Sequence, residues 1–131
     1  MTELVPPFAP DTLRRLAALA FAAGAGPMAW SAHIVVNYAL ASRLCFPNRE
    51  PLIAGHAGAG GWAVMLASDL LALAICGTGM LLSSRLKRQA HGPEAERTRF
   101  VAQCGLFAGG GFALATLFDT IALFMVPLCT L

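Results

Sequence analysis

Three long apolar runs alternate along the chain with two shorter polar stretches. The apolar runs cover about residues 16–41, 62–83 and 100–126, and Pro127 stops the last one. An α-helix needs about 20 predominantly apolar residues to cross the hydrocarbon core of a bilayer, so each run is long enough. The pattern predicts an all-α fold, an integral membrane three-helix bundle that forms one membrane domain over residues 1–131.

The two connecting stretches are recognisable from their turn-forming residues and charges. Residues 42–61 contain Pro47, Pro51 and a Gly-rich run, which predicts a loop. Residues 85–99 are the most highly charged stretch, and Gly92 and Pro93 at its centre predict a solvated turn.

Composition supports the membrane class. Hydrophobic residues make up 57% of the chain and charged residues 12%, with a mean hydropathy of +0.67. Soluble domains carry about 25% charged residues. The net charge of +2 is too small to indicate nucleic-acid binding. The first ten residues hold no Lys or Arg, so we expect no cleavable signal peptide and a retained first span.

The Lys and Arg residues predict the orientation. Arg43 and Arg49 lie on one side of the predicted bundle, whereas seven basic residues lie on the other: Arg14, Arg15, Arg85, Lys87, Arg88, Arg97 and Arg99. Because basic residues are enriched on the cytoplasmic side, we expect the N-terminus inside and the C-terminus outside. Trp62 then lies at the outer interface, where aromatic anchors are common.

Small residues recur at four-residue spacing within the first and third runs, notably Ala22 with Gly26 and Gly105 with Gly109. This spacing allows helix backbones to approach closely in a membrane. It suits packing of the three helices on one another, or docking of some faces onto another membrane subunit. Pro27 predicts a kink in the first helix, because proline removes a backbone hydrogen bond.

One ionisable residue lies inside each apolar run: His33, Asp69 and Asp119. Counted from the outer ends of the runs at about 1.5 Å per residue, all three lie roughly 10–13 Å below the outer surface. Asn37 shares a helix face with His33, and Thr116 lies three residues before Asp119. These five residues form a predicted intramembrane polar layer.

The polar layer has several interpretations. It can be a hydrogen-bonded knot that holds the helices together, with one or both carboxyl groups protonated. It can be part of a proton or ion pathway, since buried carboxylates and histidines in membranes often have that role. A metal or cofactor site is a weaker alternative, because the runs contain no second histidine to complete a bis-histidine haem site. We expect no cofactor and no bound metal.

The four cysteines divide by predicted depth. Cys45 and Cys129 both fall on the outer side, where an oxidising compartment would favour a disulfide between them. Two free thiols, or binding of copper(I), are the alternatives. Cys76 and Cys104 lie nearer the inner face and are interpreted as small buried apolar residues.

Several short motifs resemble those of a known group of proteins. They are the run from Gly26 to His33, then Tyr38 and Cys45, and a last helix that opens on Arg99-Phe100 and closes on Pro127-Leu128-Cys129. Together they resemble small bacterial membrane proteins encoded near haem–copper terminal oxidases of the cytochrome c oxidase type. The resemblance implies an accessory or assembly subunit of such an oxidase and carries over no catalytic residue.

The sequence therefore leads to two functional hypotheses. The first is a non-catalytic accessory subunit of a respiratory complex in the bacterial inner membrane, with the bilayer and other membrane subunits as partners. The second is a small homo-oligomeric protein that handles protons or ions through His33, Asp69 and Asp119. We do not expect an enzyme, because no nucleophile–base pair or metal cluster is apparent.

Overall fold

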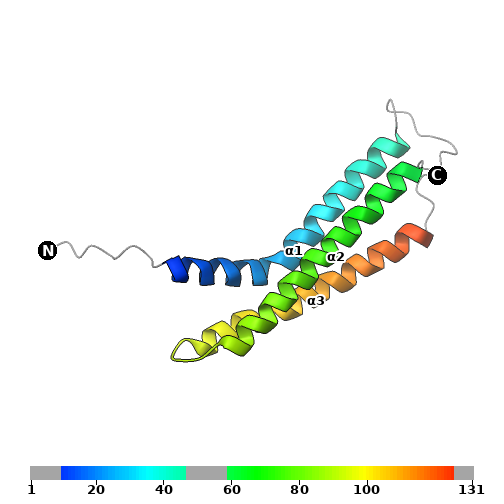
Figure 1. Ribbon diagram of the computed structural model, residues 1–131. Coiled ribbons are helices and arrows are strands. Elements are labelled where there is room, and N and C mark those ends of the chain that lie inside the picture. Colours follow the sequence, from blue (N-terminus) through cyan, green and yellow to red (C-terminus); the bar gives the residue numbers. More distant parts are fainter. Residues whose placement is uncertain (1–9, 47–58, 126–131) are drawn as a thin grey trace.

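The computed structural model describes residues 10–46 and 59–125, and the regular structure within them is entirely helical. Helix α1 spans Pro10–Cys45, α2 spans Ala59–Gln89 and α3 spans Ala95–Met125 (Figure 1). Each helix contains a stretch long and apolar enough to cross a membrane. The prediction of an all-α protein is confirmed, as is that of three helices long and apolar enough to span a membrane.

Each helix begins before the apolar run that predicted it, and the first two also continue past their runs. Helix α2 continues to Gln89 and α3 starts at Ala95, so the turn between them is much shorter than residues 85–99. Arg, Lys, Gln, Glu and Ala are good helix formers, so the charged flanks remain helical. Gly92 adopts a φ of +89°, and its carbonyl accepts a hydrogen bond of 3.1 Å from the Ala95 N–H. The turn is therefore centred where Gly92 and Pro93 predicted it.

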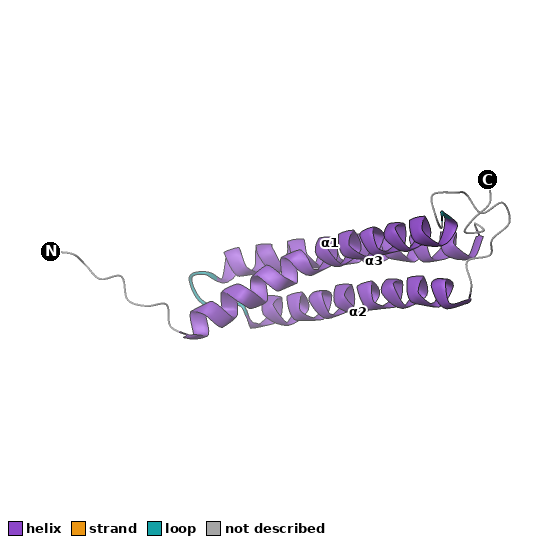
Figure 2. Ribbon diagram, turned by 90° about the horizontal axis from the view of Figure 1, so that it is seen from above, coloured by secondary structure: helices purple, strands orange, loops and turns teal. Residues whose placement is uncertain are grey.

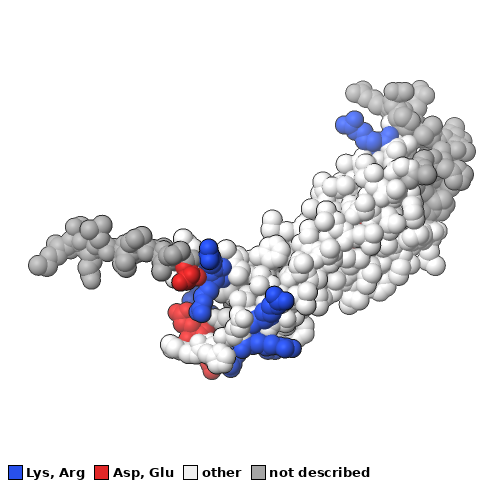
Figure 3. Space-filling view, viewed as in Figure 1, with Lys and Arg blue, Asp and Glu red and all other residues white. Residues whose placement is uncertain are grey.

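The helices run up, down and up, and each packs on the other two to form an elongated bundle (Figure 2). Helix α1 bends between its first and second halves, and Pro27 lies in its interior (Figure 1). The bend agrees with the predicted kink, since proline cannot donate to the preceding turn. On the face shown in Figure 3, charged side chains lie towards the ends of the bundle and the surface between them is uncharged.

The predicted small residues lie where α1 meets α3. A Cβ built on Gly26 would stand 3.1 Å from the Gly109 Cα, so the two backbones are almost in contact. One turn away, a Cβ on Gly105 would stand 2.6 Å from the carbonyl oxygen of Ala22. All four residues are buried. Small side chains at this crossing permit the close approach on which helix association in lipid depends.

The core consists mainly of small side chains. Ala29, Ala72 and Cys76 are buried together, and Ile75 and Phe112 pack against them. Most large apolar side chains point outwards instead, and α3 is the most exposed helix. Only 11% of its most apolar stretch is buried inside the bundle, compared with 28% for α1 and α2. This distribution suits a lipid environment, in which exposed apolar side chains carry no penalty.

Candidate functional site

The three ionisable residues of the spans meet in the interior of the bundle. The Nε2 atom of His33 on α1 lies 3.6 Å from Oδ1 of Asp69 on α2 and 3.6 Å from Oδ2 of Asp119 on α3. These distances permit electrostatic attraction but exceed those of a good hydrogen bond. A single imidazole therefore stands between two carboxyl groups, and each comes from a different helix.

Asp69 has the most complete hydrogen bonding of the three. Its side chain is 1% exposed. Oδ1 accepts a bond of 2.8 Å from the Asn37 amide, and Oδ2 accepts one of 3.1 Å from the Thr120 hydroxyl. Ser68 extends the network by donating to Asn37 Oδ1 over 2.6 Å. Asp69 thus links α2 to α1 through Asn37 and to α3 through Thr120.

Asp119 has a different environment. Its side chain is 45% exposed, although it lies well inside the apolar run of α3. Oδ2 accepts a hydrogen bond of 3.3 Å from the indole N–H of Trp30. The Trp30 ring packs against Phe112, with centroids 5.4 Å apart. Asp119 therefore joins α3 to α1 on one side and is open on the other.

We define the polar cluster by the residues that interact here: Trp30, His33, Asn37, Ser68, Asp69, Asp119 and Thr120. Four members of the predicted polar layer are brought together in it, namely His33, Asn37, Asp69 and Asp119. The fifth, Thr116, is buried but donates to the carbonyl of Phe112 on its own helix, over 2.9 Å. Its carbonyl oxygen lies 2.8 Å from the hydroxyl of Thr120, one turn further along α3, and is an alternative acceptor to Asp69 for the single proton of that hydroxyl.

Sequence reasoning missed the roles of Thr120 and Trp30. Thr120 lies four residues after Thr116 and so shares its helix face, but it is the one that reaches Asp69. Its spacing from Thr116 and its position next to Asp119 were the two signals that could have found it. Trp30 lies three residues before His33, which places its indole on the same side of α1.

The second nitrogen of His33 is buried without a partner. The residue is 4% exposed, and Nδ1 forms no hydrogen bond with any described residue. Buried N–H groups without a partner are rarer in proteins than buried acceptors without one, so the proton is better placed on the nitrogen that faces acceptors. When neutral, the ring is therefore expected to hold its proton on Nε2, facing both carboxyl groups.

An open groove of about 360 Å³ exposes the polar cluster on one side. His33, Asn37 and Asp119 form its polar part, and its apolar lining includes Ile34, Tyr38, Met65, Ala122 and Leu123. Most of the lining comes from α1 and α3. The groove gives an outside molecule access to Asp119 while Asp69 stays covered.

The geometry does not favour metal binding. Both carboxyl groups approach the same nitrogen of His33, so a metal there would have to separate contacts that already exist. Within residues 10–46 and 59–125, no group of three or more His, Cys, Asp or Glu side chains is arranged to hold a metal ion. The arrangement instead joins α1, α2 and α3 through hydrogen bonds and electrostatic attraction.

The two predictions made for the cysteines concern residues outside the polar cluster. Cys45 ends α1, whereas Cys129 lies outside the described residues, so the disulfide between them stays a prediction. Cys76 is buried, as the sequence suggested, but Cys104 is exposed on α3. The interpretation of Cys104 as a buried residue was therefore wrong. Helix α3 turns that position towards its outer face, opposite the glycines that approach α1.

No protein-family model, no curated protein and no solved structure matches this chain.

Proposed function

We propose that this chain is a non-catalytic accessory or assembly subunit of a membrane complex, and that its polar cluster meets the partner through Asp119. The half-exposed carboxyl group of Asp119 supports this proposal most directly. A carboxylate that faces lipid in mid-bilayer is expensive, at about 2.5–3.5 kcal/mol on insertion scales. A partner helix over the groove would remove that contact with lipid.

The outer surface of α3 supports the same proposal. Large apolar side chains repeat along it at seven-residue spacing or close to it and are each at least half exposed: Phe100, Phe107, Leu114, Phe118, Ile121 and Met125. Such a stripe offers a further helix a regular packing surface on α3, about a third of a turn around the helix from Asp119. Lipid can cover the stripe, but lipid cannot satisfy the carboxyl group.

The orientation of the chain, the kind of membrane complex and the disulfide are proposed from the sequence. The excess of Lys and Arg around the α2–α3 turn supports an N-terminus in the cytoplasm and a C-terminus outside. The resemblance of the motifs around Gly26–His33 supports a bacterial inner-membrane respiratory complex, specifically a haem–copper terminal oxidase. The same orientation would place Cys45 and Cys129 in an oxidising compartment, where a disulfide would tie the outer ends of α1 and α3.

A homo-oligomeric proton- or ion-handling protein is the second candidate, favoured by the imidazole that bridges Asp69 and Asp119. Along the interface inward from Asp69, however, the described core continues with Ala72 and Cys76. The side chains there do not extend the chain of proton carriers. The cluster is thus better suited to joining helices than to conducting across the membrane.

Purification of the tagged protein from native membranes in mild detergent tests the leading proposal. We expect oxidase subunits and haem absorbance to co-purify with the wild-type chain, and Asp119→Leu to release them. Asp119→Asn should retain part of the complex, because an amide still accepts and donates hydrogen bonds. Leu71→Asn on the exposed face of α2 is the matched control and should retain all of it. Migration of the wild-type chain alone, without haem, would contradict the proposal.

A measurement of ion flux distinguishes a proton- or ion-handling protein from an accessory subunit. Wild-type protein in liposomes should not dissipate a proton gradient. A flux that Asp69→Asn and Asp119→Asn abolish while oligomers remain intact would replace the accessory-subunit proposal with the transport one.

A further inference from the structure

The end of the bundle that carries the α2–α3 turn is strongly basic. Within the described residues it holds seven Lys and Arg side chains and three carboxylates, Asp11, Glu94 and Glu96. Basic residues near a membrane surface attract anionic lipid headgroups, with a contribution of about 1 kcal/mol each. Such a diffuse attraction can act without a defined binding site. Whether these residues form a binding site depends on how their side chains are arranged.

Three of these cations line one groove between α2 and α3. The groove has a volume of about 580 Å³ and is lined by Ser84, Lys87, Arg88, Arg99 and Leu106. No carboxylate is among the lining residues. Among residues 10–46 and 59–125, no Asp or Glu oxygen lies within 4.0 Å of any of the three cationic groups. Their charge is therefore not neutralised by the protein.

Two of the three cations are held in place by hydrogen bonds to uncharged groups. Lys87 donates to the side-chain oxygen of Gln103 over 2.5 Å, and Arg99 donates to the carbonyl of Ala90 over 3.1 Å. These bonds fix the side chains without cancelling their charge. Arg88 makes no hydrogen bond or ion pair with a described residue, so its guanidinium is available to an external anion.

The groove extends from the charged end into the apolar part of the bundle. Arg99 and Leu106 are seven residues apart on α3, which corresponds to about 10 Å along the helix. Beyond the groove, Leu81 on α2 and Phe107 on α3 are 62% and 72% exposed. The site is thus cationic at one end and apolar at the other, which matches an amphiphile rather than a free ion.

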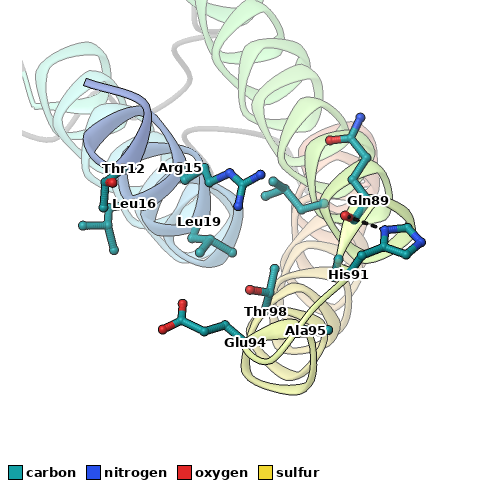
Figure 4. A pocket seen from close by; sticks show the side chains of 11 residues that line it. Thr12, Arg15, Leu16, Leu19, Gln89, His91, Glu94, Ala95 and Thr98 are labelled. Atoms are coloured by element: carbon teal, nitrogen blue, oxygen red, sulfur yellow. Dashed lines mark hydrogen bonds between the residues drawn. The ribbon is translucent and has the colours of Figure 1, made fainter. Parts of the chain in front are cut away.

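A second cavity at the same end provides a useful contrast. It has a volume of about 310 Å³ and lies between the first turns of α1 and the α2–α3 turn (Figure 4). Arg15 points towards this space from α1, and Glu94 lines it from the other side (Figure 4). One cation and one carboxylate give it little net charge, so its electrostatics do not select an anion.

We propose that the groove lined by Lys87, Arg88 and Arg99 binds the phosphate of an anionic phospholipid, with an acyl chain along Leu106. The guanidinium groups of Arg88 and Arg99 supply paired donors for phosphate oxygens, and Lys87 adds a point charge. This site lies at the opposite end of the bundle from Asp119, and the proposal does not depend on the role of the polar cluster.

Native mass spectrometry of the full chain, released from nanodiscs, tests the proposal. The nanodiscs contain equal amounts of dioleoyl phosphatidylglycerol and dioleoyl phosphatidylcholine, which differ in headgroup charge and share their acyl chains. We expect the wild-type chain to retain phosphatidylglycerol. Lys87→Gln with Arg88→Gln should weaken retention about 10- to 30-fold, as the loss of two cationic contacts predicts.

The matched control removes the same charge from the same end of the bundle. Arg14→Gln with Arg15→Gln should weaken retention by a clearly smaller factor than the groove variant does, because neither residue lines the groove and only the diffuse attraction is lost. Equal losses in the two double variants would overturn the proposal in favour of diffuse attraction, as would equal retention of the two lipids by the wild-type chain.

Inorganic phosphate distinguishes a lipid from a soluble anion. An excess of phosphate should not displace phosphatidylglycerol, because phosphate lacks the apolar contact with Leu106. Displacement at concentrations similar to that of the lipid would overturn the lipid assignment. If the double variant fails to fold by circular dichroism, Arg88→Gln alone replaces it, since Arg88 has no partner in the fold to lose. An unchanged retention in that variant would also overturn the proposal.

Discussion

The Nε2 atom of His33 lies 3.6 Å from Oδ2 of Asp119 and equally far from Oδ1 of Asp69, so one imidazole faces carboxyl groups from both other helices. Hydrogen bonds from Asn37 and Thr120 to Asp69 complete the connections among α1, α2 and α3. In lipid, where apolar burial contributes little to helix association, such bonds are one of the few forces that fix how helices meet. The polar cluster is therefore expected to contribute measurably to stability.

Asp69→Ala should destabilise the bundle by about 1–3 kcal/mol, because it leaves the Asn37 amide without its acceptor and removes the bond that ties Thr120 on α3 to α2. Asp69→Asn should cost less, since its carbonyl oxygen can still accept one of the two bonds. Unfolding of the purified protein by titration with a denaturing detergent measures both. An Asp69→Ala variant as stable as the wild type would show that the network does not hold the helices.

Thr120→Val should cost about 0.5–1.5 kcal/mol by removing the bond between α3 and α2 while keeping the shape of the side chain. Thr78→Val is a matched control, because the exposed Thr78 hydroxyl donates only to the carbonyl of Ile75 on its own helix. The same unfolding titration should find the control close to wild type. Equal costs would mean that the bond from Thr120 to Asp69 adds nothing.

Gly105→Ala should destabilise the bundle by about 1–3 kcal/mol, because the new methyl group would stand 2.6 Å from the Ala22 carbonyl oxygen and force α1 away from α3. Gly111→Ala adds the same methyl group to the same helix, and nothing lies within 4 Å of it. Thermal unfolding in detergent should separate the two variants clearly. Similar melting temperatures would argue against the close crossing.

The disulfide predicted between Cys45 and Cys129 gives a simple labelling result. The chain has four cysteines, so unfolded protein without reductant should take up two alkyl groups, on Cys76 and Cys104. After reduction it should take up four. Mass spectrometry of the intact protein counts them, with Cys129→Ser as the control that should expose Cys45. Four groups without reductant would disprove the disulfide in the purified protein.

The sequence predicted the three helices and the meeting of His33, Asn37, Asp69 and Asp119 because both depend on quantities that can be counted along a chain. The length of the apolar runs sets the helices, and the number of residues from each outer end sets the depth. Likewise, the spacing of Gly26 and Gly109 within their motifs predicted close helix packing, and the structure shows that they lie where α1 crosses α3.

The details that sequence reasoning missed depend on how each helix is rotated about its axis. Thr116 and Thr120 share a face of α3, and only packing decides which hydroxyl reaches Asp69. The same rotation exposes Cys104 and brings the Trp30 indole to Asp119. The helices also extend past the apolar runs, because charged residues outside the bilayer form helix as readily as apolar residues inside it.

We propose that a partner protein, and not lipid, covers Asp119 in the membrane. Photo-crosslinking in native membranes tests it most directly, with a photoreactive phenylalanine analogue in place of Ala122, which lines the groove beside Asp119. The same analogue in place of Leu71, on the exposed face of α2, is the control. We predict that the Ala122 position yields one discrete crosslinked species containing a subunit of a respiratory oxidase, and that the Leu71 position does not. Crosslinks to lipid alone at both positions would contradict the account.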